Sequence, residues 1–348
     1  MRVKIAVLCG GLSPERDVSL STGRRVTLAL KNLGHRAVML DMYLGLEGFT
    51  GSAEEAFDLP LPASAGGIGL TEPDLDEIRR SRRTESRSLF GERVLEVCAA
   101  ADTVFMALHG RCGEDGRVQA AFDLLGIRYT GSGYLASAAA MDKRLAKLVA
   151  REAGALTPRW RYFDAERPPE GEIELPCVVK PVDSGSSLGV EIVRERRELP
   201  AAIARAMRES AGILIEDYIE GREIQISVLD GKALPSIEII PAEGFYGYKQ
   251  KYQPGAAIER TPADITPEQE ASLASAAELI YRELGLRALA RADFILDDEG
   301  RFWFLEFNTL PGMTPTSLAP QEAEAAGMSY EELCGRIVAL SLEEDRQL

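Results

Sequence analysis

Two carboxylates and a carboxamide near the end of the chain have the residue types and spacing of a metal site. Two apolar runs flank the sequence Asp-Asp-Glu-Gly at 297–300, which is typical of a β-hairpin turn. If the runs pair across this turn, Asp293 lies close to the position opposite Glu306, and Asn308 shares the face of Glu306. Such oxygen ligands suit a hard cation like Mg²⁺, which completes its shell with water and substrate phosphates. Solvated acids on an ordinary hairpin are the alternative, but unpaired charge inside apolar strands is costly, so a metal–phosphate site is favoured.

A second stretch, 180–189, has the composition of a phosphate-binding loop. It reads Lys-Pro-Val-Asp-Ser-Gly-Ser-Ser-Leu-Gly and begins at a predicted strand end. Its glycines allow close approach of the backbone to a phosphate, and N–H groups together with the hydroxyls of Ser186 and Ser187 can surround it. The pattern is not the P-loop G-x-x-x-x-G-K-S/T, and a plain β-hairpin explains this loop equally well when it is taken alone. Together with the downstream oxygen ligands, it indicates nucleotide binding.

Two further segments could complete a nucleotide site. The sequence Glu-Asp-Tyr-Ile at 216–219, with Glu223, places an aromatic and an aliphatic side chain between acids that could bind adenine and ribose. The aromatic and basic stretch at 245–255 has the character of a lid that closes over anionic ligands. Core packing or surface charge is the alternative for each residue of the first segment, and a surface loop or interface patch for the second.

Composition and charge exclude several classes of protein. The 348 residues are enough for two or three domains, and the net charge of −15 argues against nucleic acid or an anionic membrane as the main partner. No apolar run approaches the ~20 residues of a membrane span, and the chain leads directly into a strand rather than a signal peptide. Five cysteines without C-x-x-C spacing predict reduced thiols in the cytoplasm, and two histidines are too few for a multi-histidine metal site.

The first third of the chain predicts a parallel α/β unit. Strands at 3–8 and 37–41 enclose an amphipathic helix, and such a βαβ unit implies parallel strands. A Gly-Gly pair follows the first strand, but G-x-G-x-x-G is absent, which disfavours a dehydrogenase. Residues 44–93 predict a long excursion with one helix, and a buried strand at 103–108 then runs into a glycine-rich loop.

The remainder predicts two units built from antiparallel strands. The first is a small α+β unit, with helices at 136–153 and 199–208 and strands at 177–181, 190–193 and 213–218. The second is a largely antiparallel sheet whose strands lie at 224–229, 234–240, 292–296 and 301–307. We expect helices at 267–286 and 329–343 to cover one face of this second sheet.

In their order along the chain, these motifs resemble the D-alanine–D-alanine ligase family of ATP-grasp enzymes. The resemblance runs from end to end except in 44–93, and it is carried by residues 10–19, 109–116, 129–133, 141–143, 180–189, 246–252, 291–293, 306–313 and 317–318. It implies an α/β and α+β fold with three-domain ATP-grasp architecture. The implied parts are an N-terminal parallel-sheet α/β domain (1–131), a central subdomain (132–216), and a C-terminal subdomain (217–348) with a lid loop at 241–261.

The resemblance also implies a reaction and a set of site residues. ATP would transfer its γ-phosphoryl group to the carboxylate of one D-alanine, and the amine of a second D-alanine would attack the acyl phosphate. The implied ATP-binding residues are Lys143, Lys180, Ser186, Ser187, Glu216, Tyr218, Ile219, Glu223 and Lys251. Two Mg²⁺ ions, which Mn²⁺ could replace, would be held by Asp293, Glu306 and Asn308. The implied catalytic residues are Glu15, Ser186, Tyr252, Arg291 and Gly312, and the substrate-binding residues are Glu15, His109, Lys251 and Ser317.

Alternatives to this function come from the same family and from another class. Relatives that use D-lactate carry a histidine in the lid, and 241–261 contains none, so a peptide product for peptidoglycan synthesis is favoured over a D-alanine–D-lactate depsipeptide. A D-alanine–D-serine ligase stays open as a further alternative. A non-catalytic ATP-binding regulatory protein is the alternative of a different class, but it has no need of Arg291 or of the pairing between Glu15 and Tyr252. By resemblance, we expect a cytoplasmic homodimer.

Overall fold

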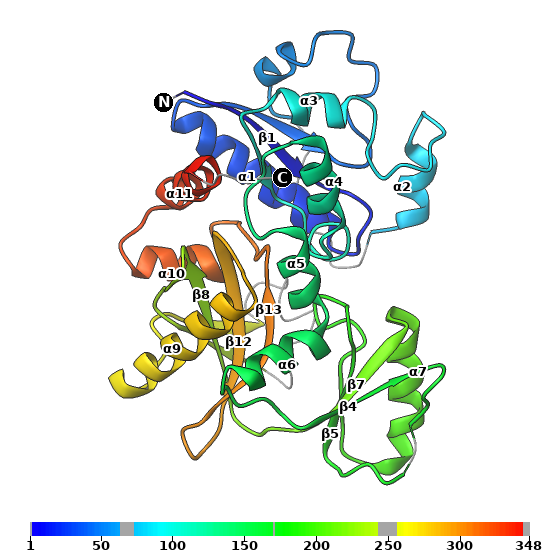
Figure 1. Cartoon of the computed structure of the whole chain (residues 1–348), viewed down its shortest axis with the longest axis vertical. Coiled ribbons are helices and arrows are strands. Elements are labelled where there is room, and N and C mark those ends of the chain that lie inside the picture. The colour runs from blue at the N-terminus through cyan, green and yellow to red at the C-terminus, as the bar shows by residue number, and fades with distance from the viewer. Residues whose placement is uncertain (1, 63–72, 170, 243–255, 344–348) are drawn as a thin grey trace.

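The computed structural model describes residues 2–62, 73–169, 171–242 and 256–343, and within them the strands form three sheets (Figure 1). The first sheet is parallel, in the order β2-β1-β3. Its strands are β1 (Lys4–Cys9), β2 (Arg36–Asp41) and β3 (Thr103–Met106), and α1 (Arg16–Asn32) connects the first two. The central strand β1 is buried along almost its whole length, as expected for parallel strands covered on both faces. The predicted βαβ unit is confirmed.

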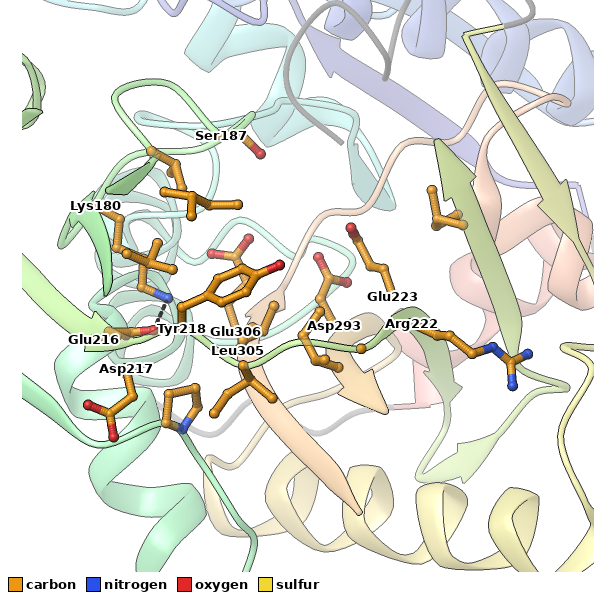
Figure 2. A pocket seen from close by; sticks show the side chains of 18 of the residues that line it. Lys180, Ser187, Glu216, Asp217, Tyr218, Arg222, Glu223, Asp293, Leu305 and Glu306 are labelled. Carbon is orange, nitrogen blue, oxygen red and sulfur yellow. Dashed lines mark ion pairs between the residues drawn. The ribbon is translucent and has the colours of Figure 1, made fainter. Parts of the chain in front are cut away.

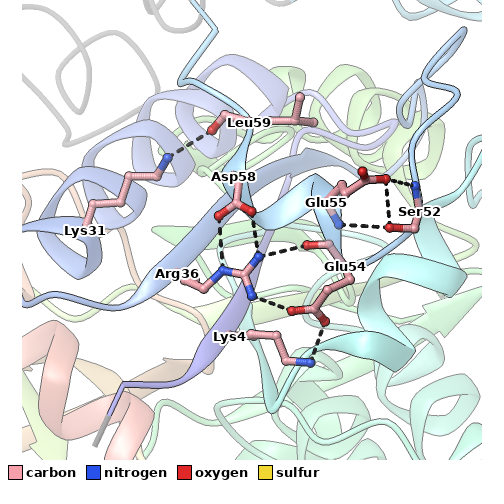
Figure 3. Close-up of polar contacts among 8 residues, drawn as sticks. All are labelled: Lys4, Lys31, Arg36, Ser52, Glu54, Glu55, Asp58 and Leu59. Carbon is pink, nitrogen blue, oxygen red and sulfur yellow. Dashed lines mark hydrogen bonds and ion pairs between the residues drawn. The ribbon is translucent and has the colours of Figure 1, made fainter.

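Ion pairs attach the first part of the 44–93 segment to the edge of this sheet (Figure 3). Arg36 on β2 pairs with Glu54 and, through Nη2 at 2.7 Å, with Asp58, while Lys4 on β1 lies 2.9 Å from Glu54. The hydrogen bond from Arg36 lowers the pKa of Asp58. The charges are solvent-exposed, so each pair adds little stability, and their combined effect is to fix the position of the turn. Among its described residues, 44–62 and 73–93, the segment contains a 3-10 turn, η1 (Glu55–Asp58), and one helix, α2 (Leu75–Ser81), before α3 (Val94–Ala100).

The helix predicted at 136–153 is wrong, because the chain breaks at Asp142. After α4 (Arg117–Leu125), two helices follow: α5 (Tyr134–Met141) and α6 (Lys143–Glu152). Asp142 has ψ of 100°, outside the helical region, and its carboxylate accepts hydrogen bonds from the backbone N–H groups of Arg144 and Leu145. This is an N-cap, which starts a new helix rather than continuing the old one. Lys143 therefore stands at the first position of α6, where its N–H bonds to the carbonyl of Val182 at 2.9 Å.

The second sheet is antiparallel and has the order β4-β7-β5-β6. Its members are β4 (Trp160–Asp164), β5 (Cys177–Pro181), β6 (Glu191–Val193) and β7 (Gly212–Asp217). After the turn η2 (Arg196–Glu198), helix α7 (Leu199–Glu209) packs on β5 and β7. The predicted α+β unit is confirmed, and β4 is an addition that its short, half-exposed and charged sequence did not reveal.

The third sheet is antiparallel, with the order β11-β10-β8-β12-β13 and a short β9 beside β8. Its strands are β8 (Arg222–Leu229), β9 (Lys232–Ala233), β10 (Ile237–Pro241), β11 (Ala257–Arg260), β12 (Leu289–Leu296) and β13 (Phe302–Asn308). Helix α9 (Pro267–Glu283) contacts β8 and β9, and its apolar residues share a core with Phe294 and Phe304. The sequence predicted that a helix at 267–286 would cover one face of this sheet, as α9 does.

The C-terminal helix does not cover that face as predicted. After α10 (Leu318–Ala325), helix α11 (Tyr330–Glu343) packs mainly on α1 and β3 of the first sheet, and Figure 1 shows it in red beside α1 in blue. Its apolar side shares one core with Val26 and Leu30 of α1, and it contributes Leu333, Ile337 and Val338 to that core. The chain therefore returns to its N-terminal sheet. Within the described ranges, no helix is both long enough and apolar enough to cross a bilayer.

Candidate active site

A cavity of about 610 Å³ lies between the second and third sheets, a volume typical of a small-molecule site (Figure 2). Strands β5, β6 and β7 contribute one side, and β8, β10, β12 and β13 the other. Nine residues expected to bind ATP or metal line it together: Lys143, Lys180, Ser187, Glu216, Tyr218, Ile219, Glu223, Asp293 and Glu306.

Apolar side chains form one part of the cavity wall. Val178 on β5 lies directly across from Ile192 on β6, and Leu305 contributes from β13. The guanidinium of Arg194 lies 5.0 Å from the ring centre of Tyr218, which is a cation–π distance. A flat apolar slot of this kind suits a purine base. Sequence reasoning found Tyr218 but missed Val178 and Ile192, because their contribution depends on strand pairing.

Lysines and carboxylates form the other part of the wall. Lys143 Nζ lies 2.9 Å from Glu306 Oε2 and donates to the carbonyl of Ser184 at 2.6 Å. Lys180 Nζ lies 2.9 Å from Glu216 Oε2, a pair that Figure 2 draws. Lys143 is thus held at the 183–189 loop, and Lys180 lines the same cavity, so both ammonium groups could meet a triphosphate there.

The predicted metal ligands occupy adjacent strands. Asp293 on β12 is directly opposite Glu306 on β13, as the hairpin predicted, and both line the cavity. Asn308 lies on the same strand as Glu306, and its amide donates to Asp293 Oδ2 at 3.2 Å. Figure 2 also shows Glu223 of β8 beside Asp293, with its carboxylate directed into the same space. The register part of the metal-site prediction is therefore confirmed.

A β-bulge lies directly beside the pair formed by Asp293 and Glu306. The register shifts between Asp293 and Phe294, so Phe294 pairs with Phe304 and leaves Leu305 as an extra residue on β13. Strict alternation would place Leu305 and Glu306 on opposite faces, yet both line the cavity. Bulges next to active sites redirect side chains in this way. Sequence alternation could not reveal the bulge.

Arg291 provides the charge partner of Asp293. Its Nε lies 2.8 Å from Asp293 Oδ1, and its own strand position is opposite Asn308. Over the part of the chain that the structure describes, no cluster of three or more His, Cys, Asp or Glu side chains offers a metal site. Two carboxylates and one amide nevertheless fit Mg²⁺, which takes few protein ligands. Arg291 and Lys143 pair with these two carboxylates and hold them at the cavity wall.

Glu15 joins the N-terminal part to the phosphate loop. It precedes α1, and its carboxylate accepts a hydrogen bond from Ser186. The carboxylate lies so close to Gly110 and Gly185 that a Cβ on either would overlap it. Three loops distant in sequence therefore converge on one carboxylate, and the expected pairing of Glu15 with Ser186 is present. The expected third member, Tyr252, lies with Lys251 outside the described residues, as does most of the lid.

His109 and Glu114 connect the glycine-rich loop with the segment after β13. His109 Nε2 is 3.0 Å from Thr22 Oγ1, and Nδ1 is 2.9 Å from the carbonyl of Leu310; burial lowers the pKa of this imidazole. Glu114 accepts from the N–H groups of Gly110 at 2.9 Å and Leu310 at 3.1 Å, and burial raises its pKa to about 7. Both ring nitrogens of His109 have protein partners, so a contact with substrate stays a prediction.

Gly312 and Ser317 lie in one tight turn after β13. The N–H of Thr314 donates to Ser317 Oγ at 3.1 Å, and a Cβ on Gly312 would overlap that hydroxyl. The two predicted residues are therefore neighbours, and glycine is needed at 312 for this packing.

Glu322 is a buried carboxyl group beneath the site, and it gives a stability prediction. It accepts hydrogen bonds from the N–H of Ser227 at 3.0 Å and from the Ser227 hydroxyl, and Ser227 is the strand partner of Arg291. Burial raises the pKa of Glu322 to about 8. A raised pKa stabilises the fold at low pH, and this contribution is lost as pH rises from about 4.5 through about 8.

Glu322→Gln should therefore remove that part of the pH dependence. The free energy of unfolding, measured by urea denaturation from pH 5 to pH 9, should fall less with pH in the variant than in the wild type, by roughly 1.4 kcal/mol per unit of pKa shift. Glu324→Gln, an exposed change on the same helix, should keep the wild-type dependence. Parallel curves for Glu322→Gln and the wild type would contradict the burial argument.

Comparison with known proteins agrees with this geometry. The family model described as D-ala D-ala ligase N-terminus matches residues 4–132, and the model described as D-ala D-ala ligase C-terminus matches 161–339. The chain therefore belongs to the D-alanine–D-alanine ligase family. Curated family members from Pediococcus pentosaceus and Lacticaseibacillus casei are 42% and 40% identical to it, over 97% of this chain and 97% and 95% of theirs.

Solved structures of the family have the same fold. The D-alanine–D-alanine ligase of Bacillus anthracis complexed with ATP is 29% identical, with a TM-score of 0.72 over 98% of this chain and 97% of that one. The VanG D-Ala:D-Ser ligase of Enterococcus faecalis is 27% identical, with a TM-score of 0.75 over 98% of this chain and 100% of that one. The predicted ATP-grasp fold class, with its N-terminal parallel sheet, is confirmed.

Proposed function

We propose that this chain is an ATP-dependent D-alanine–D-alanine ligase that supplies dipeptide for peptidoglycan precursors. Membership of the family supports the activity, and relatives that cover nearly the whole chain carry that name. The observation that carries the assignment is a cavity in which two lysines, an apolar slot and two opposed carboxylates meet. The lysines suit a triphosphate, the apolar slot suits a purine, and the carboxylates suit a cation.

The nucleotide would occupy the cavity from the apolar slot to the carboxylates. Adenine would lie against Tyr218 and Ile219, with Glu216 and Glu223 as acceptors for its amino group and the ribose hydroxyls. Lys143, Lys180 and the loop with Ser186 and Ser187 would bind the phosphates, as implied by resemblance. Charge-assisted hydrogen bonds of this type are about twice as strong as neutral ones.

Asp293, Glu306 and Asn308 would hold two Mg²⁺ ions, or Mn²⁺ in their place. Bound there, the ions would neutralise the charge of the phosphates during transfer. The contribution of the chain is the fixed register that places the two carboxylates directly opposite each other. Lys143 pairs with Glu306 and Arg291 with Asp293, and these ion pairs would hold the two carboxylates in position for the ions.

The amino-acid substrates would lie between Glu15, Arg291 and the turn at Gly312. Glu15 would pair with the ammonium of the first D-alanine, near His109. Arg291 and the N–H of Gly312 would stabilise the oxyanion as the amine of the second D-alanine attacks the acyl phosphate, since fixed donors are most effective where charge develops. Ser317, with Lys251 of the lid, would bind the second carboxylate.

The second substrate is the part of this function with close alternatives. The D-Ala:D-Ser ligase has a similar fold, and a D-lactate user would differ mainly in the lid. With no lid histidine, we expect the alanine amine to be the better nucleophile above about pH 7, because a larger fraction of the amine is then unprotonated than at lower pH.

The test is a competition among D-alanine, D-lactate and D-serine at equal concentrations with ATP, read by mass spectrometry of the products. D-alanyl-D-alanine should dominate above about pH 7, and its lead over the depsipeptide should narrow at lower pH. Depsipeptide or a D-serine product dominating above pH 7 would overturn the choice of second substrate. Binding of ATP with no product at all would favour the non-catalytic regulatory alternative.

The proposal also includes the domain boundaries, the oligomeric state and the cellular location. We place the domain boundaries at 131/132 and 216/217, with a lid at 241–261, and the second boundary falls near the end of β7. A homodimer and a cytoplasmic location follow from the family resemblance and from the use of ATP, and sedimentation velocity of the purified chain would test the dimer.

A further inference from the structure

Lys147 is a fully buried lysine directly behind the nucleotide cavity. It lies one turn after Lys143 on α6, with a relative exposure of 0%. Its ammonium donates to Thr157 Oγ1 at 2.8 Å and to the carbonyl of Phe304 at 3.3 Å, and it lies 3.2 Å from Glu216 Oε1. A buried ammonium is costly, and hydrophobic residues of similar size usually replace it where only packing is required.

Glu216 is shared between two lysines. Its Oε1 faces Lys147, and its Oε2 lies 2.9 Å from Lys180. All three side chains are at least nine-tenths buried, so water screens their charges poorly. One carboxylate cannot neutralise two ammonium groups, and the three charges sum to +1. Lys180 lines the cavity, whereas Lys147 lies on the far side of the carboxylate.

We propose that Lys147 is a positioning residue for ATP: it holds Glu216 from behind and so leaves the positive charge of Lys180 available to the phosphates. The inference rests on the proposed nucleotide site. Without Lys147, Glu216 and Lys180 would form a closed neutral pair, and Lys180 would have to break that pair to bind phosphate. Lys147 itself would not touch the ligand.

The charge state of Lys147 sets the conditions of the test. Burial lowers its pKa to about 7, with Glu216 acting in the opposite direction and Lys180 in the same one. Glu306 on β13 also favours the charged form. Binding is therefore measured at pH 6.5, where the ammonium predominates.

The first experiment is calorimetric titration of the whole chain with ATP and with adenosine. Lys147→Met should weaken ATP binding about tenfold or more, since loss of one charge-assisted contact costs at least about 1.4 kcal/mol. Adenosine, which has no phosphate, should change less than about threefold on the same scale. Lys147→Gln, which keeps a donor for Thr157 but no charge, should behave like Lys147→Met, and Arg151→Met on the exposed side of α6 should behave like the wild type.

The second experiment is a rescue. Glu216 also lines the adenine site, so the reference is Glu216→Gln alone. In that background the carboxylate that would sequester Lys180 is gone, and adding Lys147→Met should change ATP affinity less than about threefold. A purely structural role of Lys147 predicts no rescue and equal losses for ATP and adenosine, and either result would overturn the inference. ATP binding unchanged in both Lys147 variants would also overturn it. Absence of ATP binding by the wild type would instead overturn the proposed function.

Discussion

Glu306→Gln should reduce the rate of D-alanine-dependent phosphate release by at least about 100-fold, because the loss of one metal-site charge weakens stabilisation of the transferring phosphoryl group. The change keeps the side-chain volume, and Glu306 is partly exposed at the cavity wall, so the fold should remain intact. The measurement is steady-state phosphate release over a range of Mg²⁺ concentrations, with circular dichroism as the check on folding.

The matched control is Asp298→Asn in the turn of the same hairpin. Asp298 is exposed and lies outside the cavity lining, so its removal should change the rate less than about twofold. Near-normal rates of the Glu306→Gln variant at saturating Mg²⁺ would contradict the assignment of Glu306 as a metal ligand.

Arg291→Lys should lower kcat by about 100-fold while changing ATP affinity little, since one oxyanion donor contributes a factor of 10²–10³. Lysine keeps a positive charge for Asp293 but loses the planar pair of donors that Arg291 directs at it through Nε and Nη2. We therefore expect a large loss of kcat although the lysine keeps an ion pair with Asp293. It is measured by kcat for dipeptide formation and by calorimetric ATP binding on the same preparations.

Arg282→Lys on the exposed side of α9 is the control for the same chemical change. It should leave both quantities within about twofold of the wild type. If Arg291→Lys instead raised the dissociation constant for ATP and spared kcat, Arg291 would belong to nucleotide binding and not to the oxyanion site.

Local sequence patterns predicted the parts of this site that depend on one hairpin. The Asp-Asp-Glu-Gly turn between two apolar runs was enough to place Asp293 opposite Glu306, because the turn fixes the register nearby. The same reasoning could not find Leu305, since a bulge depends on how the two strands fit the neighbouring core. The relative position of the two acids was readable from the sequence, but the shape of the wall beside them was not.

Long-range packing set the other limits. Helix α11 has an apolar stripe that fits any apolar surface, and only the folded chain shows it packed on α1 and β3. Lys147 could be read as a solvated helix residue, although its spacing of four from Lys143 places both on one face of α6. The break at Asp142 was foreseeable, because an aspartate before a run of helix formers is an N-cap signal.

The most direct test of the central claim is phosphate release from ATP by the purified chain in the presence of Mg²⁺. D-alanine should stimulate release strongly, with one D-alanyl-D-alanine formed for each phosphate, while L-alanine, D-lactate alone and no added substrate should give only background. Release that is independent of D-alanine, or that occurs without dipeptide, would contradict the account.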